Sequence, residues 1–183
     1  LEVFDPPQWG RLFRLDGCYM TSERDEFFYH EPIVHPAAIA HPKPVSALVI
    51  GGGDGGSSEE LLKHPSIERV VMAELDAEVV RVARKHLGSV HRGAFDDARL
   101  QVRIGDGWEL VEAMARAGEE RFDLVVLDLT DPDTPAHRLY SADFLRMLQR
   151  VMNPGAAVTL HIGSPVYRPD AVARLLREVS SVF

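Results

Sequence analysis

Acidic residues follow the ends of several predicted strands, where their carboxylates could bind hydroxyl groups or cations. Glu74 lies about 20 residues after the start of a glycine-rich segment. At this spacing an acid accepts hydrogen bonds from a ribose diol. Asp106 follows the next strand, where an acid accepts from an adenine amine or caps a helix. Asp128 and Asp131 lie close together in the chain, and two neighbouring acids are costly to assemble without a cation. These acids favour contacts to a nucleoside and to a cation, against the alternatives of surface acids and a plain acidic loop.

The glycine-rich segment reads Gly-Gly-Gly-Asp-Gly-Gly over residues 51–56. Gly51, Gly53 and Gly56 satisfy the dinucleotide-binding pattern G-x-G-x-x-G. Glycine permits a tight turn and a close approach of the backbone to a ligand. A turn that merely joins a strand to a helix is the alternative.

Other reactive residues give weaker signals. Tyr29 and His30 precede a predicted short helix over residues 31–42, where packing and a surface histidine are the simpler interpretation. The remaining histidines show no metal-ligand spacing, so we expect no metal site. Neither a nucleophile elbow nor a P-loop motif is present.

The elements that must position these residues alternate between strand and helix. Apolar, β-branched runs predict strands over residues 45–53, 69–76, 100–107, 122–129 and 156–163. Amphipathic segments between and after them predict helices over residues 57–64, 77–87, 108–118, 141–152 and 169–179. This order predicts an α/β fold, a doubly wound parallel sheet of the Rossmann-like, class I methyltransferase-like type.

We expect two parts in the chain. Residues 1–28 predict a small N-terminal β-hairpin region with an Asp-Gly turn at Asp16 and Gly17. Residues 29–183 predict the catalytic domain, and we expect this domain to continue beyond Phe183, because the last strands usual in such sheets are absent.

Composition limits the classes of partner. The net charge of −8 argues against nucleic acid, which basic surfaces bind. No apolar run approaches the length of a membrane span. The single cysteine, Cys18, excludes an intrachain disulfide, so a cytoplasmic protein is expected.

Together these residues resemble the polyamine aminopropyltransferases, the spermidine synthase family, over nearly the whole chain. The similar motifs, in chain order, are Leu15-Asp16-Gly17, Glu23-Arg24-Asp25-Glu26, Tyr29-His30-Glu31, the glycine-rich segment, Glu74-Leu75-Asp76, Asp106-Gly107 and Asp128-Leu129-Thr130-Asp131-Pro132. The resemblance implies transfer of an aminopropyl group from decarboxylated S-adenosylmethionine, a co-substrate, to putrescine or a related amine. The products would be spermidine or a related polyamine and methylthioadenosine. It implies no tightly bound cofactor, and a homodimer.

The resemblance also implies roles for individual residues. The donor would be bound by Gly51, Gly53, Asp54, Glu74, Asp106, Gly107 and Pro135. The amine groups would be bound by Tyr29, His30, Asp54, Asp128 and Asp131. Asp131 would accept the proton, and Tyr29 and Asp128 would assist catalysis.

Some residues depart from the family pattern and keep other functions open. Asp133 and Thr134 replace an apolar residue and a glycine, and His161 stands where the family commonly has glutamine. A non-catalytic polyamine- or nucleoside-binding homologue is therefore one alternative. An S-adenosylmethionine-dependent methyltransferase is another, although Asp54 in the glycine loop would repel the carboxylate of its donor. A nicotinamide oxidoreductase is disfavoured, because no second domain with a catalytic base is visible.

Overall fold

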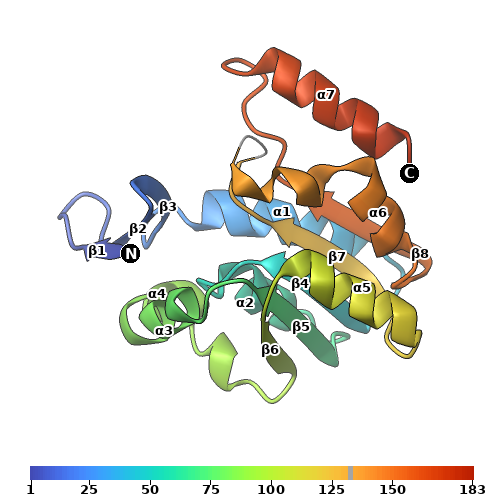
Figure 1. Cartoon of the computed structure of the whole chain (residues 1–183). Helices are drawn as coiled ribbons and strands as arrows, with labels where there is room; N and C mark the ends of the chain where they lie inside the picture. The colour runs from blue at the N-terminus through green and yellow to red at the C-terminus, as the bar shows by residue number, and fades with distance from the viewer. Residues whose placement is uncertain (132–133) are drawn as a thin grey trace.

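A computed structural model describes residues 1–131 and 134–183, and only the backbone of Pro135. Its centre is a five-stranded sheet in which every neighbouring pair is parallel (Figure 1). The strand order is β6 (Leu100–Ile104), β5 (Arg69–Glu74), β4 (Ser46–Gly51), β7 (Phe122–Asp128) and β8 (Met152–Leu160). The chain starts this sheet in the middle, at β4, and adds strands first on one side and then on the other. The predicted doubly wound α/β fold is confirmed.

Helices cover both faces of the sheet because its strands are apolar on both sides. One face packs against α1 (Phe27–Ala40), α2 (Gly56–Leu62) and α3 (Ala77–His86). The opposite face packs against α5 (Gly107–Ala117) and α6 (Ala142–Gln149). The remaining helical elements are α4 (Gly88–His91), the 3-10 turns η1 (Ala94–Asp96) and η2 (Pro135–Tyr140), and α7 (Pro169–Ser180). No helix among the described residues is long and apolar enough to cross a membrane.

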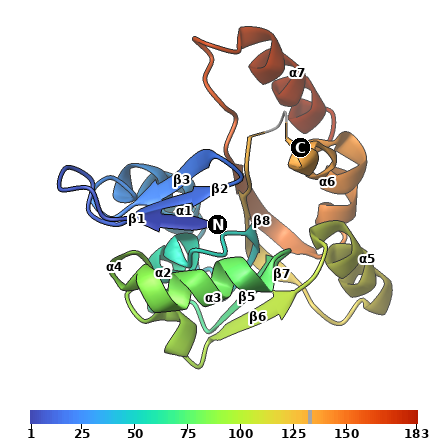
Figure 2. The same cartoon turned by 60° about the vertical axis from the view of Figure 1, so that its left-hand side comes forward.

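A small antiparallel sheet precedes the main domain and consists of β1 (Glu2–Phe4), β2 (Leu12–Leu15) and β3 (Cys18–Ser22). Asp16 and Gly17 both have positive φ at the β2–β3 turn, as the predicted Asp-Gly hairpin turn requires. Phe13 of β2 is buried against α3 and α4, so this sheet is docked on the main domain (Figure 2). Ser89 Oγ also donates to the Glu23 carboxylate across this contact at 2.5 Å.

Two elements differ from the sequence prediction. Helix α1 begins at Phe27 and contains Pro32 and Pro36, whereas the prolines predicted a shorter helix. Burial of its apolar side chains against the sheet offsets the lost backbone hydrogen bonds. Strand β8 starts at Met152 and includes Pro154, whereas the sequence predicted a helix up to residue 152 and a strand only from residue 156. Its pairing with β7 is interrupted at this point, where a proline without an N–H is tolerated.

Candidate active site

The glycine loop lies at the carboxyl end of β4, beside the end of β7. Gly51 pairs with Asp128 in the sheet register, and Gly52 N–H donates to the Asp128 carbonyl at 2.9 Å. Gly51 has a φ of +82°, and a Cβ there would lie 2.1 Å from the Asp128 carbonyl oxygen. Only glycine fits this position, and its absence of a side chain brings the loop against the acid that ends β7.

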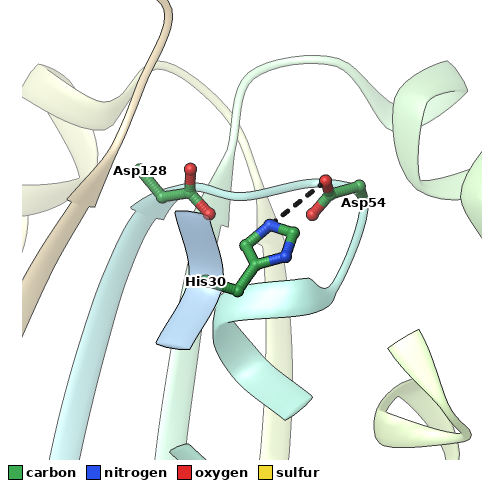
Figure 3. A group of neighbouring side chains, drawn as sticks. All are labelled: His30, Asp54 and Asp128. Atoms are coloured by element: carbon green, nitrogen blue, oxygen red, sulfur yellow. Dashed lines mark ion pairs between the residues drawn. The ribbon is translucent and has the colours of Figure 1, made fainter. Parts of the chain in front are cut away.

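Asp54, at the tip of this loop, lies between the backbone and a histidine. Its Oδ1 accepts from Gly56 N–H at 3.0 Å, and its Oδ2 lies 3.5 Å from His30 Nε2 (Figure 3). Burial favours the neutral carboxyl, but the charge and hydrogen bond of His30 outweigh burial and lower the pKa of Asp54. Asp54 is therefore an ionised, oriented carboxylate.

Asp128 forms a second carboxylate beside the first. Its Oδ1 accepts from the Tyr29 hydroxyl at 2.9 Å, and its Oδ2 accepts from Ser57 Oγ at 2.7 Å. Burial and the nearby charge of Asp54 raise the pKa of Asp128 above its ordinary value. A cation placed between Asp54 and Asp128 would relieve this repulsion.

His30, Asp54 and Asp128 each offer a ligand atom within 4.8 Å of the others, the arrangement in which a metal ion can bind. The Nε2 of His30 faces Asp54, however, and Nδ1 lies 2.7 Å from Glu26 Oε2. Burial lowers the pKa of His30, but Asp54 and Glu26 outweigh burial and raise it to about 11. An imidazolium has no lone pair for a metal, so the two carboxylates suit an organic cation better.

Glu74, at the end of β5, closes the other side of the glycine loop. Its Oε1 accepts from Asp76 N–H at 2.9 Å, and Oε2 would lie 2.7 Å from a Cβ at Gly53. Burial is the main cause of the raised pKa of Glu74. This carboxylate lies at the carboxyl edge of the sheet, at the position from which such folds bind a ribose.

Asp106 follows β6 and caps α5, with the backbone N–H of Trp108 donating to its Oδ1 at 2.9 Å. The capping role is thus confirmed. Its second oxygen forms an ion pair with Arg138 of η2, whose guanidinium lies 5.8 Å from the centre of the Trp108 ring. Gly107 begins α5 and packs against Ile50, where a Cβ would lie 2.9 Å from Ile50 Cγ2.

Asp131 is not part of the cluster formed by His30 and the two partly buried carboxylates. Its side chain is 61% exposed, and its Oδ1 is 3.4 Å from His161 Nδ1. The His161 ring in turn meets the Tyr29 ring edge-on, with the centroids 5.8 Å apart. Pro132 and Asp133 lie outside the described residues, as does the side chain of Pro135, which begins η2.

The structure therefore gathers Tyr29, His30, Asp54 and Asp128 into one cluster, with Glu74 on the far side of the glycine loop. Sequence reasoning gave no role to three residues that contact predicted site residues. Glu26 contacts His30, Ser57 contacts Asp128, and Arg138 contacts Asp106. Glu26 stands four residues before His30, the spacing of neighbours on a helix. This signal was hidden because α1 was expected to start after His30 instead of at Phe27.

Comparisons with known proteins identify the family to which the chain belongs. A family model described as the spermine/spermidine synthase domain matches residues 26–183. The polyamine aminopropyltransferase of Nitrosomonas europaea is 52% identical over 183 residues, which cover 100% of this chain and 55% of that protein. The polyamine aminopropyltransferase of Aeropyrum pernix is 46% identical over 176 residues, covering 95% of this chain and 55% of that protein.

Two solved structures are similar over 99% of this chain and 60% of their own, each at 35% sequence identity. One is a spermidine synthase in complex with the transition-state analogue AdoDATO, with a TM-score of 0.92. The other is spermidine synthase from Thermotoga maritima, with a TM-score of 0.90. The chain thus spans little more than half the length of the relatives it matches. Since the family model covers most of the chain, the chain belongs to the spermine/spermidine synthase family, as its motifs predicted.

Proposed function

We propose that this protein transfers an aminopropyl group from decarboxylated S-adenosylmethionine to putrescine or a related amine. The observation that carries the proposal is the pair of partly buried carboxylates, Asp54 and Asp128, held side by side at the glycine loop. Both substrates of this reaction are cationic, and opposite charges attract strongly in a partly desolvated site. The names of the similar proteins and the analogue bound to one of them support the same assignment.

The donor would lie across the carboxyl edge of the sheet. Glu74 would accept from the ribose hydroxyls, and Asp106 with Gly107 would bind the adenine. Gly51 and Gly53 would bring the loop backbone to the donor, since the absence of side chains lets the loop pack directly against the Asp128 carbonyl and the Glu74 carboxylate. Pro135 would cover the adenine. Asp54 would accept from the ammonium of the aminopropyl arm and would repel the carboxylate of ordinary S-adenosylmethionine.

The acceptor amine would lie among Tyr29, His30, Asp128 and Asp131. An aliphatic ammonium must lose a proton before it can attack, because its pKa is about 10. Asp131 would take this proton, assisted by Tyr29 and Asp128. The neutral nitrogen then attacks the propyl carbon bonded to sulfur, the carbon–sulfur bond breaks, and its electron pair leaves with neutral methylthioadenosine. Alignment of nitrogen and carbon would supply most of the acceleration.

Other features of the proposal concern the whole protein. Residues 29–183 would form the catalytic domain and residues 1–28 a separate N-terminal β region. We expect a homodimer in the cytoplasm that binds small amines and neither nucleic acid nor membrane. Size measurement of the full-length protein by light scattering tests the dimer.

The function is tested by isothermal titration of the full-length protein with decarboxylated S-adenosylmethionine, S-adenosylmethionine and methylthioadenosine. Putrescine is then added, and release of methylthioadenosine is measured. Tighter binding of the decarboxylated donor and amine-dependent release are expected. Preference for the carboxylated donor would instead indicate a methyltransferase, and binding without release a non-catalytic homologue.

A further inference from the structure

The buried side of the amine site contains an acid that the proposed reaction does not use. Glu26, just before α1, is 4% exposed, although nothing in the transfer requires a carboxylate there. Its Oε2 lies 2.7 Å from His30 Nδ1, and the His30 ring is itself 2% exposed. A buried carboxylate is costly unless it is paired, so this contact needs an explanation.

The pair belongs to a row of alternating charges that leads to the donor site. The Nη2 atom of Arg92, the residue that follows α4, lies 3.3 Å from Glu26 Oε1. Glu26 then contacts His30 Nδ1, and His30 Nε2 contacts Asp54 Oδ2 at 3.5 Å. Asp54 is the carboxylate that the proposed function places against the aminopropyl ammonium. Figure 3 shows the His30 ring lying beside Asp54, with the ion pair between them.

The His30 ring is also fixed by packing. A Cβ at Gly56 would lie 2.2 Å from His30 Cε1, so the ring sits directly on the bare backbone at the start of α2. The Tyr29 ring meets it edge-on, with centroids 5.3 Å apart. With both nitrogens facing carboxylates, the ring has one orientation in which each N–H has an acceptor.

We propose that Glu26 is a positioning residue: it fixes the His30 ring through Nδ1, so that Nε2–H keeps the Asp54 carboxylate turned toward the donor's ammonium. This inference rests on the proposed function, because the ammonium belongs to the proposed donor. Three other charged or titratable groups lie close to the row: Asp128 of β7, Glu59 of α2 and His91 of α4. Glu59 Oε1 is 4.0 Å from Arg92 Nη1, and the charge of His91 lowers the pKa of Asp54. Glu26 is the group that contacts Nδ1 of the His30 ring, at 2.7 Å, so Glu26 is the group that can orient this side of the ring.

The test compares Glu26→Gln and Glu26→Ala with the wild type in the full-length protein. Methylthioadenosine lacks the aminopropyl ammonium, so it reports donor-site binding without Asp54. We expect Glu26→Ala to weaken binding of decarboxylated S-adenosylmethionine about tenfold and of methylthioadenosine less than about twofold. Glu26→Gln keeps an acceptor for Nδ1–H and should recover part of the loss. Glu31→Gln, an exposed acid on the same helix, is the matched control and should change neither affinity.

Nitrogen NMR of His30 gives a readout that a purely structural role would not move. In the wild type both ring nitrogens should remain protonated from pH 6 to pH 9. In Glu26→Ala the ring should begin to lose its proton within that window, because removing an adjacent opposite charge lowers a histidine pKa by about 1–3 units. A wild-type His30 that titrates near pH 6.5 would overturn the inference even if the variants do not fold.

The binding data separate this inference from the function on which it rests. Equal losses of both ligands in Glu26→Ala, or no loss of either, would overturn the positioning role alone. A wild type that binds methylthioadenosine but gains no affinity from the aminopropyl arm would overturn the proposed function, and the positioning role with it.

Discussion

Replacing Gly53 by alanine tests whether Glu74 binds the donor. The new methyl carbon would lie 2.7 Å from Glu74 Oε2 and 2.7 Å from Val79 Cγ1. To restore an ordinary contact of 3.4 Å, the carboxylate must retreat by about 0.7 Å. The carboxylate is buried, and its Oε1 already accepts a hydrogen bond from Asp76 N–H. It can therefore move only by losing this hydrogen bond or by turning away from the ligand.

The expected cost follows from these contacts. Overpacking should reduce the free energy of unfolding by about 1–3 kcal/mol. Misalignment of a charged hydrogen bond costs about 1.5–3 kcal/mol, which corresponds to a loss of at least about tenfold in affinity for methylthioadenosine. Urea unfolding measures the first quantity and isothermal titration the second, with protein concentration and pH held constant.

Gly88→Ala is the matched control for this substitution. A Cβ at Gly88 meets no atom within 4 Å, and Gly88 begins the short helix α4. This change should leave binding unaltered and raise stability by about 0.4–1 kcal/mol, because alanine restricts the unfolded chain more than glycine does. If Gly53→Ala bound methylthioadenosine as tightly as the wild type, Glu74 could not be the ribose ligand.

Three further predictions concern protons. Asp131→Asn should keep donor affinity but lower turnover about 10²–10⁴-fold in the methylthioadenosine release assay; normal turnover would remove Asp131 as the base. Tyr29→Phe removes a hydrogen bond that lowers the pKa of Asp128, so the acid limb of the activity profile should move to higher pH; an unmoved limb would mean that Asp128 need not be ionised. His30 has a folded pKa of about 11 against an ordinary 6.5. Its stabilisation is therefore complete below pH 6.5 and is lost as the pH rises toward 11, by up to about 1.4 kcal/mol per unit. Urea unfolding from pH 6 to pH 10 measures the free energy of unfolding at each pH. This free energy should fall less steeply with pH in His30→Gln than in the wild type, and equal slopes would contradict the assignment.

The strand ends and their acids could be predicted from the sequence because both signals are local. Apolar runs define the strands, and Glu74 and Asp128 stand within or next to those runs. A parallel sheet then brings its carboxyl ends to one edge, whatever the side chains do. The glycine loop is equally local, since positive φ angles at Gly51 and Gly55 favour glycine.

The partners of these acids could not be predicted, because they depend on how separate helices pack. Arg138 reaches Asp106 from η2, and Ser57 reaches Asp128 across the β4–β7 contact. No spacing in the sequence encodes either pairing. The contact of Glu26 with His30 was within reach, but two prolines concealed the true start of α1.

The register that places Gly51 opposite Asp128 also has a consequence for folding. Strand β4 lies early in the sequence. Its neighbour β7, which completes the site, follows only after two intervening strand–helix units. Pairings between distant segments carry a loop-closure cost and form slowly. A partly folded chain in which β4 and β5 have paired but β7 has not would contain the glycine loop without Asp128. A ligand that needs both the glycine loop and Asp128 will bind only chains in which β7 has paired with β4. Binding of such a ligand therefore reports that this pairing has formed. The ligand stabilises the folded chain by an amount that grows with its concentration, by mass action.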